Sequence, residues 1–187
     1  MIRSYLLVVA SLWAQGLAAQ GTVVLPEPAL DAGRATLRDE LLRFRDTLNT
    51  VDAASARLQR DYRQVSAAAL TSRARVMSDA CARSARSTAT AQKAVLAADA
   101  SDKRRLQSQA ELLKTLDRLR GVLSRCAADF AEMSKPEASE TVRGYGNNRA
   151  VRVQSEIRQY ERVLATFFHS MGIKVTPLGS RARPVAG

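Results

Sequence analysis

The forty residues LRDELLRFRDTLNTVDAASARLQRDYRQVSAAALTSRARV (37–76) decide the predicted fold. Alternate steps of four and three residues meet apolar side chains at ten of twelve positions. The twelve positions are Leu37, Leu41, Phe44, Leu48, Val51, Ser55, Leu58, Tyr62, Val65, Ala69, Ser72 and Val76. A straight helix repeats every 3.6 residues, so a 3.5-residue apolar period of this length predicts helices that wind around each other.

The apolar stripe shifts by one residue near Val76 and then continues with smaller side chains. Its second part comprises Met77, Cys81, Ser84, Thr88, Ala91, Val95 and Ala98. A helix break within residues 71–79 predicts a four-helix bundle, whereas one helix running on to Ala98 predicts an elongated hairpin. Ordinary helix lengths favour the break. The absence of Gly and Pro from residues 35–120 favours continuity. We expect the break.

Two further helices follow a turn at residues 99–102, where Asp99, Ser101 and Asp102 are all good capping residues. The first has the stripe Leu112, Leu116, Leu119, Leu123, Cys126, Phe130 and Met133. The second has the stripe Ala150, Val153, Ile157, Tyr160, Leu164, Phe167 and Met171, and Gly172 is placed to end it. Residues 134–149 contain Pro136 and two glycines and are predicted to form a loop. The fold class is therefore all-α: an antiparallel bundle or coiled-coil hairpin of three or four long helices.

The first nineteen residues have the layout of a secretory signal peptide. Arg3 precedes an apolar run at residues 5–13, and small residues end in Ala18 and Ala19, where cleavage is expected. We predict a signal peptide at 1–19, an extended leader at 20–31, a helical domain at 32–173 and a disordered basic tail at 174–187. No later stretch is apolar enough to span a bilayer, so we expect an exported protein of the periplasm or the medium.

Cys81 and Cys126 are the only cysteines, and both occupy core-facing positions on either side of the predicted turn. Two cysteines in an exported protein most often form one disulfide. The bond would close a loop of about 46 residues and contribute about 4 kcal/mol in the chain-entropy model.

The chain is strongly basic, with 29 Lys and Arg against 18 Asp and Glu and a formal net charge of +11. Residues 73–105 hold eight basic and three acidic side chains, and residues 141–187 hold eight and two. The positive electrostatic field of these two segments is expected to attract an anionic envelope component or an acidic protein partner. Few aromatic residues lie off the core stripes, and together with the export signal this disfavours nucleic acid. The candidate contacts are Lys103, Arg104, Arg105, Arg181, Arg183 and the loop residue Tyr145. The alternative for the basic groups is a solvated helix start and tail.

The sequence lacks the residue arrangements that catalysis would require. His169, the only histidine, falls opposite the core stripe of the last helix, so it is expected to face solvent. No Cys or His pairs have metal-ligand spacing, and no nucleotide-binding glycine motif occurs. We therefore predict a protein without catalytic activity, metal or cofactor.

Two functions fit these observations. The first is a structural or interaction module of the envelope that holds a partner through its helical faces and basic ends. The alternative is a periplasmic holdase-like chaperone that binds unfolded envelope proteins. Self-association is a third possibility, because the small-residue stripe at 77–98 can accept another helix.

Overall fold

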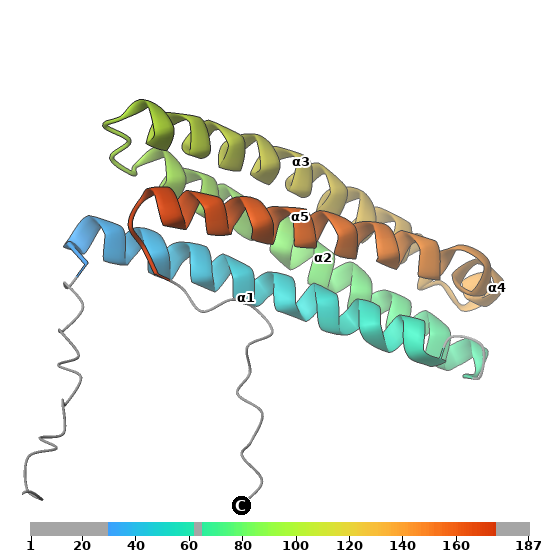
Figure 1. Ribbon diagram of the computed structural model, residues 1–187. Coiled ribbons are helices and arrows are strands. Elements are labelled where there is room, and N and C mark those ends of the chain that lie inside the picture. The colour runs from blue at the N-terminus through green and yellow to red at the C-terminus, as the bar shows by residue number, and fades with distance from the viewer. Residues whose placement is uncertain (1–29, 62–64, 175–187) are drawn as a thin grey trace, which may run out of the picture.

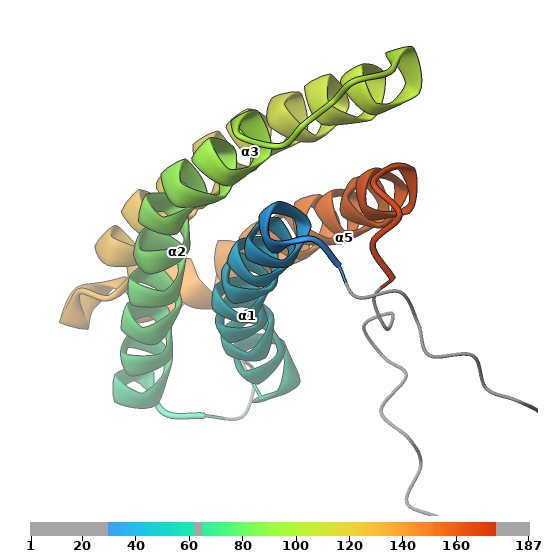
Figure 2. The same cartoon turned by 90° about the vertical axis from the view of Figure 1, so that its left-hand side faces the viewer.

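The computed structural model describes residues 30–61 and 65–174, in which four long helices form an antiparallel bundle (Figure 1). They are α1 (Ala32–Asp61), α2 (Ala67–Leu96), α3 (Lys103–Met133) and α5 (Asn147–Ser170). Each packs against two neighbours in the order α1, α2, α3, α5, so that α2 and α5 lie on opposite corners (Figures 1 and 2). The predicted all-α bundle is confirmed. The signal peptide, nearly all of the leader and all but Lys174 of the tail lie outside the described residues.

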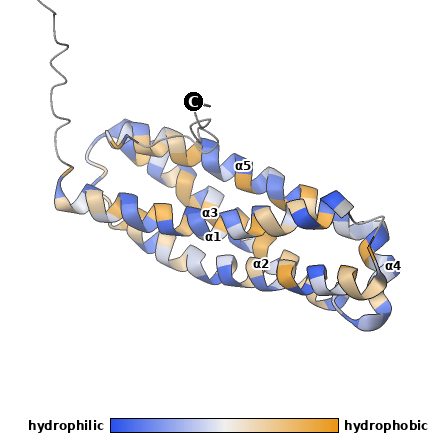
Figure 3. Ribbon diagram, turned by 90° about the horizontal axis from the view of Figure 1, so that it is seen from below, coloured by the Kyte–Doolittle hydropathy of each residue, from blue (hydrophilic) through white to orange (hydrophobic). Residues whose placement is uncertain are grey.

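The predicted stripes of α3 and α5, and that of α1 as far as Leu58, form the core. Leu37, Leu123 and Ile157 are 4%, 0% and 6% exposed. Val163 and Phe168 of α5, which lie beside the predicted stripe, are also buried. In Figure 3 the helices carry hydrophilic and hydrophobic residues in alternating patches, as expected when each has one core-facing stripe.

The helix break lies earlier than predicted. Helix α1 ends at Asp61 and α2 begins at Ala67, so residues 71–79 are continuous helix. The Ser66 hydroxyl accepts a hydrogen bond from the Ala69 amide and caps α2. The stripe therefore restarts at Leu70, and its buried members are Leu70, Ala74, Met77, Cys81, Ser84, Thr88, Ala91 and Val95. Ser72 and Val76 are consequently exposed, and Tyr62 lies outside the described residues.

The core stripe of α2 is made mainly of small side chains, which allow its neighbours to approach closely. The Ser84 hydroxyl donates to the Thr47 carbonyl of α1 at 3.1 Å, and the Thr88 hydroxyl donates to the Ser84 carbonyl. These bonds satisfy hydroxyl groups that burial would otherwise leave without water. On the other side, Cys81 and Cys126 form the predicted disulfide between α2 and α3, with 5.9 Å between their Cα atoms.

Residues 136–149 are helical, although residues 134–149 were predicted to form a loop. They contain a short 3-10 helix (Pro136–Ala138), α4 (Ser139–Thr141) and the π-helix η2 (Val142–Gly146), which leads directly into α5. Val142 is fully buried, and a Cβ on Gly146 would lie 3.2 Å from the Val142 side chain. The Arg143 guanidinium donates to the Val65 carbonyl in the α1–α2 turn. The connection therefore packs down and closes this end of the bundle.

Of the three capping residues predicted in the turn at residues 99–102, Asp102 is the N-cap of α3. Asp31 caps α1, and the predicted end of α5 at Gly172 is confirmed. Asp31 accepts from the Arg34 amide and Asp102 from the Arg105 amide, as N-caps do. Gly172 has φ of 69°, and the Ile173 amide donates to the Phe168 carbonyl. This arrangement is a Schellman motif, and it turns Ile173 back into the core.

Candidate functional site

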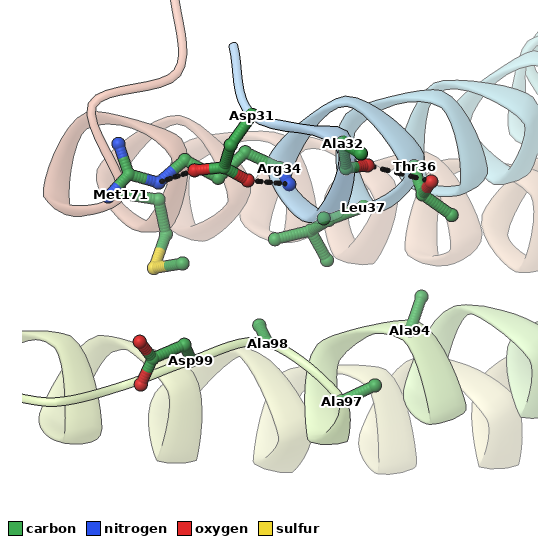
Figure 4. Close-up of a pocket in the computed structure, with 11 residues that line it drawn as sticks. Asp31, Ala32, Arg34, Thr36, Leu37, Ala94, Ala97, Ala98, Asp99 and Met171 are labelled. Carbon is green, nitrogen blue, oxygen red and sulfur yellow. Dashed lines mark hydrogen bonds and ion pairs between the residues drawn. The ribbon is translucent and has the colours of Figure 1, made fainter.

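The two ends of the bundle differ, and the end opposite the α4–η2 connection contains a groove. We call it the open end; there α1 begins, α2 ends, α3 begins and α5 ends (Figure 2). A groove of about 660 Å³ lies between the start of α1 and the end of α2 (Figure 4). It is lined by Asp31, Ala32, Gly33, Arg34, Thr36, Leu37, Ala94, Ala97, Ala98, Asp99 and Met171.

The open-end groove exists because the side chains on its walls are too short to fill the space between the helices. Ala94 and Ala98 face it from α2 and the turn after it, and Leu37 and Met171 point into it from α1 and the end of α5 (Figure 4). Leu37 is 4% and Met171 is 2% exposed, so both are held firmly by the core. The groove therefore has an apolar base beneath walls of methyl groups.

Most polar groups in the groove already have partners within the chain. The Arg34 guanidinium lies 3.3 Å from the Asp31 carboxylate, and the Thr36 hydroxyl donates to the Ala32 carbonyl. Asp99 is exposed and forms no ion pair with any described residue. The groove thus offers apolar surface and one carboxylate at its edge.

Contacts from α3 fix the other helices at the open end. The Gln109 side chain donates to the carbonyls of Val95 and Ala98, at 2.7 and 3.3 Å, and so ties the start of α3 to the end of α2. The Ser108 and Ser170 hydroxyls lie 2.7 Å apart and join α3 to α5. These bonds fix the ends of α2 and α5 against the start of α3.

Two large apolar side chains near the groove are exposed to solvent. Leu96, the last residue of α2, is 65% exposed, and Leu106, in the first turn of α3, is 53% exposed. Both flank the α2–α3 turn at the open end. Together with the groove they concentrate apolar surface at one end of the bundle.

The closed end has a second groove, which contains the predicted contact Tyr145. It also encloses about 660 Å³, and five of its ten lining residues are charged: Asp129, Glu132, Lys135, Glu137 and Arg149. Glu132 pairs with Lys135, and Asp129 pairs with Arg149. Tyr145 is 64% exposed and lies in the π-helix rather than in a loop. Most of its charged groups are paired within the chain, as in the open-end groove, and Glu137 forms no ion pair with a described residue.

The other predicted contacts have different surroundings. Lys103 and Arg104 are exposed at the start of α3 and form no ion pair within the described part of the chain. Arg105 pairs with Asp102 and donates to the Ser170 carbonyl at 3.3 Å, so it ties α3 to α5. Arg181 and Arg183 lie outside the described residues. Lys103, Arg104 and Arg105 do not line the open-end groove.

A polar cluster is buried between α1 and α5. The Arg45 Nε, Tyr160 hydroxyl and Glu161 Oε1 atoms are buried and have no hydrogen-bond partner among the described residues. Burial raises the pKa of Glu161 to about 6, and the nearby Arg45 charge opposes this increase. Burial, together with the Glu161 charge, also raises the pKa of the Tyr160 phenol. Tyr160 is fully buried, Arg45 and Glu161 are half-buried, and none of the three lines either groove.

The described residues contain no group of three or more His, Cys, Asp or Glu side chains placed to hold a metal ion. His169 is exposed, as its position on α5 predicts. Across residues 30–61 and 65–174, no helix combines the length and hydropathy needed to cross a bilayer.

Sequence reasoning did not find the open-end groove. Its only signal is the run of short side chains at Ala94, Ala97 and Ala98, which also occurs in helices that pack tightly. No family model matches the chain, and no match is found among curated proteins or solved structures.

Proposed function

We propose that this chain is an exported, non-enzymatic interaction module of the cell envelope, which holds an apolar segment of a protein partner in the open-end groove. The observation that carries the proposal is the groove itself, a preformed apolar space at the end of a disulfide-bonded bundle. Binding sites are typically concave, apolar and preformed, because a partner then gains burial without reorganising the protein.

The groove favours a particular kind of partner segment. Its base, Leu37 and Met171, supports burial of small or medium apolar side chains, and the Asp99 carboxylate at its edge has no cation within the described part of the chain. A segment with two or three apolar residues and a neighbouring Lys or Arg meets both features. The charge contact at this exposed position contributes orientation more than affinity.

The chemistry of the groove supports a binding role over catalysis. The Thr36 hydroxyl is bonded to a backbone carbonyl, and the Asp31 carboxylate is paired with Arg34. His169 does not line the groove. A nucleophile therefore has no neighbouring base with which to act.

The distribution of apolar surface supports a defined partner over a holdase-like chaperone. Exposed large apolar side chains in the described residues are few: Val76, Leu96, Leu106, Tyr145 and Val151, of which Leu96 and Leu106 flank the α2–α3 turn at the open end. A chaperone that grips many unfolded clients needs a wide apolar surface. The groove at the open end instead fits one short segment.

Site-specific photocrosslinking in the cells that make the protein tests this function. A photoreactive amino acid replaces Ala97 at the rim of the groove, and a control chain carries it at Ala165, which is exposed on α5. We expect one predominant adduct from position 97 and none of that adduct from position 165. Mass spectrometry should place the linkage in a short apolar segment of the partner.

Three results would count against the proposal. A scatter of unrelated envelope proteins, combined with suppression of aggregation of unrelated unfolded proteins, would indicate the holdase function. The same adduct from both positions would show that the groove is not the contact. The absence of any adduct from position 97 would remove the function assigned to the groove.

A further inference from the structure

The solvent-facing side of α2 carries a row of cations that the groove does not use. Helix α2 has five basic residues and one acidic residue, the largest imbalance of the four long helices. Arg75, Arg83, Arg86 and Lys93 are exposed, and none of them forms an ion pair with a described residue. We call these four residues the α2 basic face.

The four cations share one side of the helix. At 3.6 residues per turn they fall within an arc of about 80°, and they extend over about 27 Å between Arg75 and Lys93. The buried stripe of α2 lies on the opposite side of the helix, facing α1 and α3. Because α2 is a corner of the bundle, its basic face is not covered by another helix (Figure 2). The only acidic residue on this face is Asp79.

The other long helices neutralise more of their charge within the chain. On α1, Arg38 pairs with Asp39 and Arg43 with Glu40. Arg118 of α3 pairs with Glu156 of α5 at 2.8 Å. Within the described residues the α2 basic face has no comparable pair, so its positive potential is available to an external anion.

We propose that the α2 basic face docks the protein on an anionic phospholipid surface. A row of cations on the convex side of a helix suits a flat, fluid array of headgroups, which requires no pocket and no fixed spacing. Small exposed residues such as Ser72, Ala89 and Thr90 stand beside the cations, so the long basic side chains can reach a plane. Helix α2 contains no aromatic residue, and this argues against single-stranded nucleic acid and against a protein hot spot.

This inference rests on the proposed envelope location for its biological setting, and it uses a different surface from the groove. Each cation held near an anionic membrane contributes about fivefold to partitioning. Binding through charge alone weakens as ionic strength rises, because the Debye length falls to about 8 Å at 0.15 M salt. We therefore expect peripheral, salt-sensitive association that positions the open end near the membrane.

Vesicle co-sedimentation of the purified full chain tests the inference. The probes are vesicles of phosphatidylcholine alone and of phosphatidylcholine with phosphatidylglycerol. We expect binding only to the anionic vesicles. Replacing the α2 basic face with glutamines (R75Q, R83Q, R86Q and K93Q) should lower the partition coefficient at least about 25-fold, the effect expected if only two of the four cations reach the headgroups.

A matched variant distinguishes the effect of the α2 basic face on vesicle binding from the effect of net charge. R125Q, R152Q, R158Q and R162Q remove four exposed cations from α3 and α5 and change the formal charge by the same amount. This variant should keep most of the vesicle binding. Circular dichroism of both variants should match the parent chain, because all eight residues are exposed.

The outcomes are distinct. Equal loss in both variants would show that net charge alone is responsible, and binding that both variants retain would show that the α2 basic face is not used; either result overturns the inference. Binding to an acidic polysaccharide or an acidic protein through the same four residues, without vesicle binding, would assign the face to a soluble polyanion and also overturn it. Failure of the groove crosslink with intact vesicle binding would remove only the proposed function.

Discussion

Filling the open-end groove should stabilise the protein, which is the opposite of the usual effect of enlarging an alanine in a helical bundle. Ala94 faces the groove from α2, in the last turns of that helix (Figure 4). The substitution Ala94→Leu adds three carbon atoms, and full burial of three carbons contributes about 2.4 kcal/mol at about 0.8 kcal/mol per methylene. The groove is open on one side and a leucine loses about 0.5–1 kcal/mol of rotamer entropy, so we expect a net gain of about 1 kcal/mol.

The control is the same substitution three residues earlier. Ala91 is 1% exposed, where the surrounding core leaves no space. Ala91→Leu should therefore destabilise the protein by about 1–3 kcal/mol through overpacking. Denaturant unfolding, followed by circular dichroism, measures both variants. Thermal unfolding should show an increase of about 2–4 °C for Ala94→Leu. If both substitutions destabilise the protein to a similar extent, the space beside Ala94 is not a groove and the reasoning fails.

Three further predictions concern the interior. Burial raises the pKa of Glu161 from 4.5 to about 6, so the folded parent chain binds this proton more tightly than the unfolded chain does. The free energy of unfolding of the parent should therefore fall as the pH rises from 4.5 to about 6. Glu161→Gln should stabilise the protein by about 1 kcal/mol above pH 6, after allowance for the partial exposure of this group. Urea unfolding between pH 4.5 and about pH 6 measures how stability depends on pH, and this dependence should be smaller in the Glu161→Gln variant. Tyr160→Phe should raise the free energy of unfolding by about 1 kcal/mol, because it removes a buried hydroxyl that has no partner among the described residues. The variant keeps the ring contact with Phe44. A loss of more than about 1 kcal/mol would instead show that the hydroxyl has a hydrogen-bond partner. Replacing Cys81 and Cys126 with alanines should cost about 4 kcal/mol, and an unchanged unfolding midpoint would contradict the contribution of the disulfide.

The heptad periodicity predicted most of the fold because burial of apolar side chains leaves a direct trace in the sequence. The stripe of α5 has no polar member, and all of its residues are buried. The disulfide could also be predicted, since both cysteines belong to core stripes on either side of a recognisable turn.

The α1–α2 turn was misplaced because it contains neither Gly nor Pro. The apolar period runs across the turn by coincidence, through Val65 and Ala69, and the cap at Ser66 is a weak local signal. The connection before α5 was misassigned for the opposite reason. Its glycines suggested a loop, but Gly146 is buried within continuous helix, where a Cβ would lie 3.2 Å from the Val142 side chain. Tertiary contacts decided both segments.

The groove was not predictable because its walls look like ordinary tightly packed helix. Alanines permit close approach where a neighbouring helix is present and leave a gap where the helices diverge. The sequence identified the basic character of residues 73–105 and predicted Lys103, Arg104 and Arg105 as the contacts within that range. The structure adds that the four cations of the α2 basic face lie in one row on a side of α2 that no neighbouring helix covers.

Binding of a partner segment at the open end can be measured by chemical-shift mapping with a synthetic peptide of the crosslinked segment. We expect saturable shifts of the backbone amides of Leu37, Ala94, Ala97 and Met171, and weaker binding by Ala94→Leu. Shifts confined to the Tyr145 groove or to the α2 basic face, with the Leu37 and Met171 amides unmoved, would contradict the account.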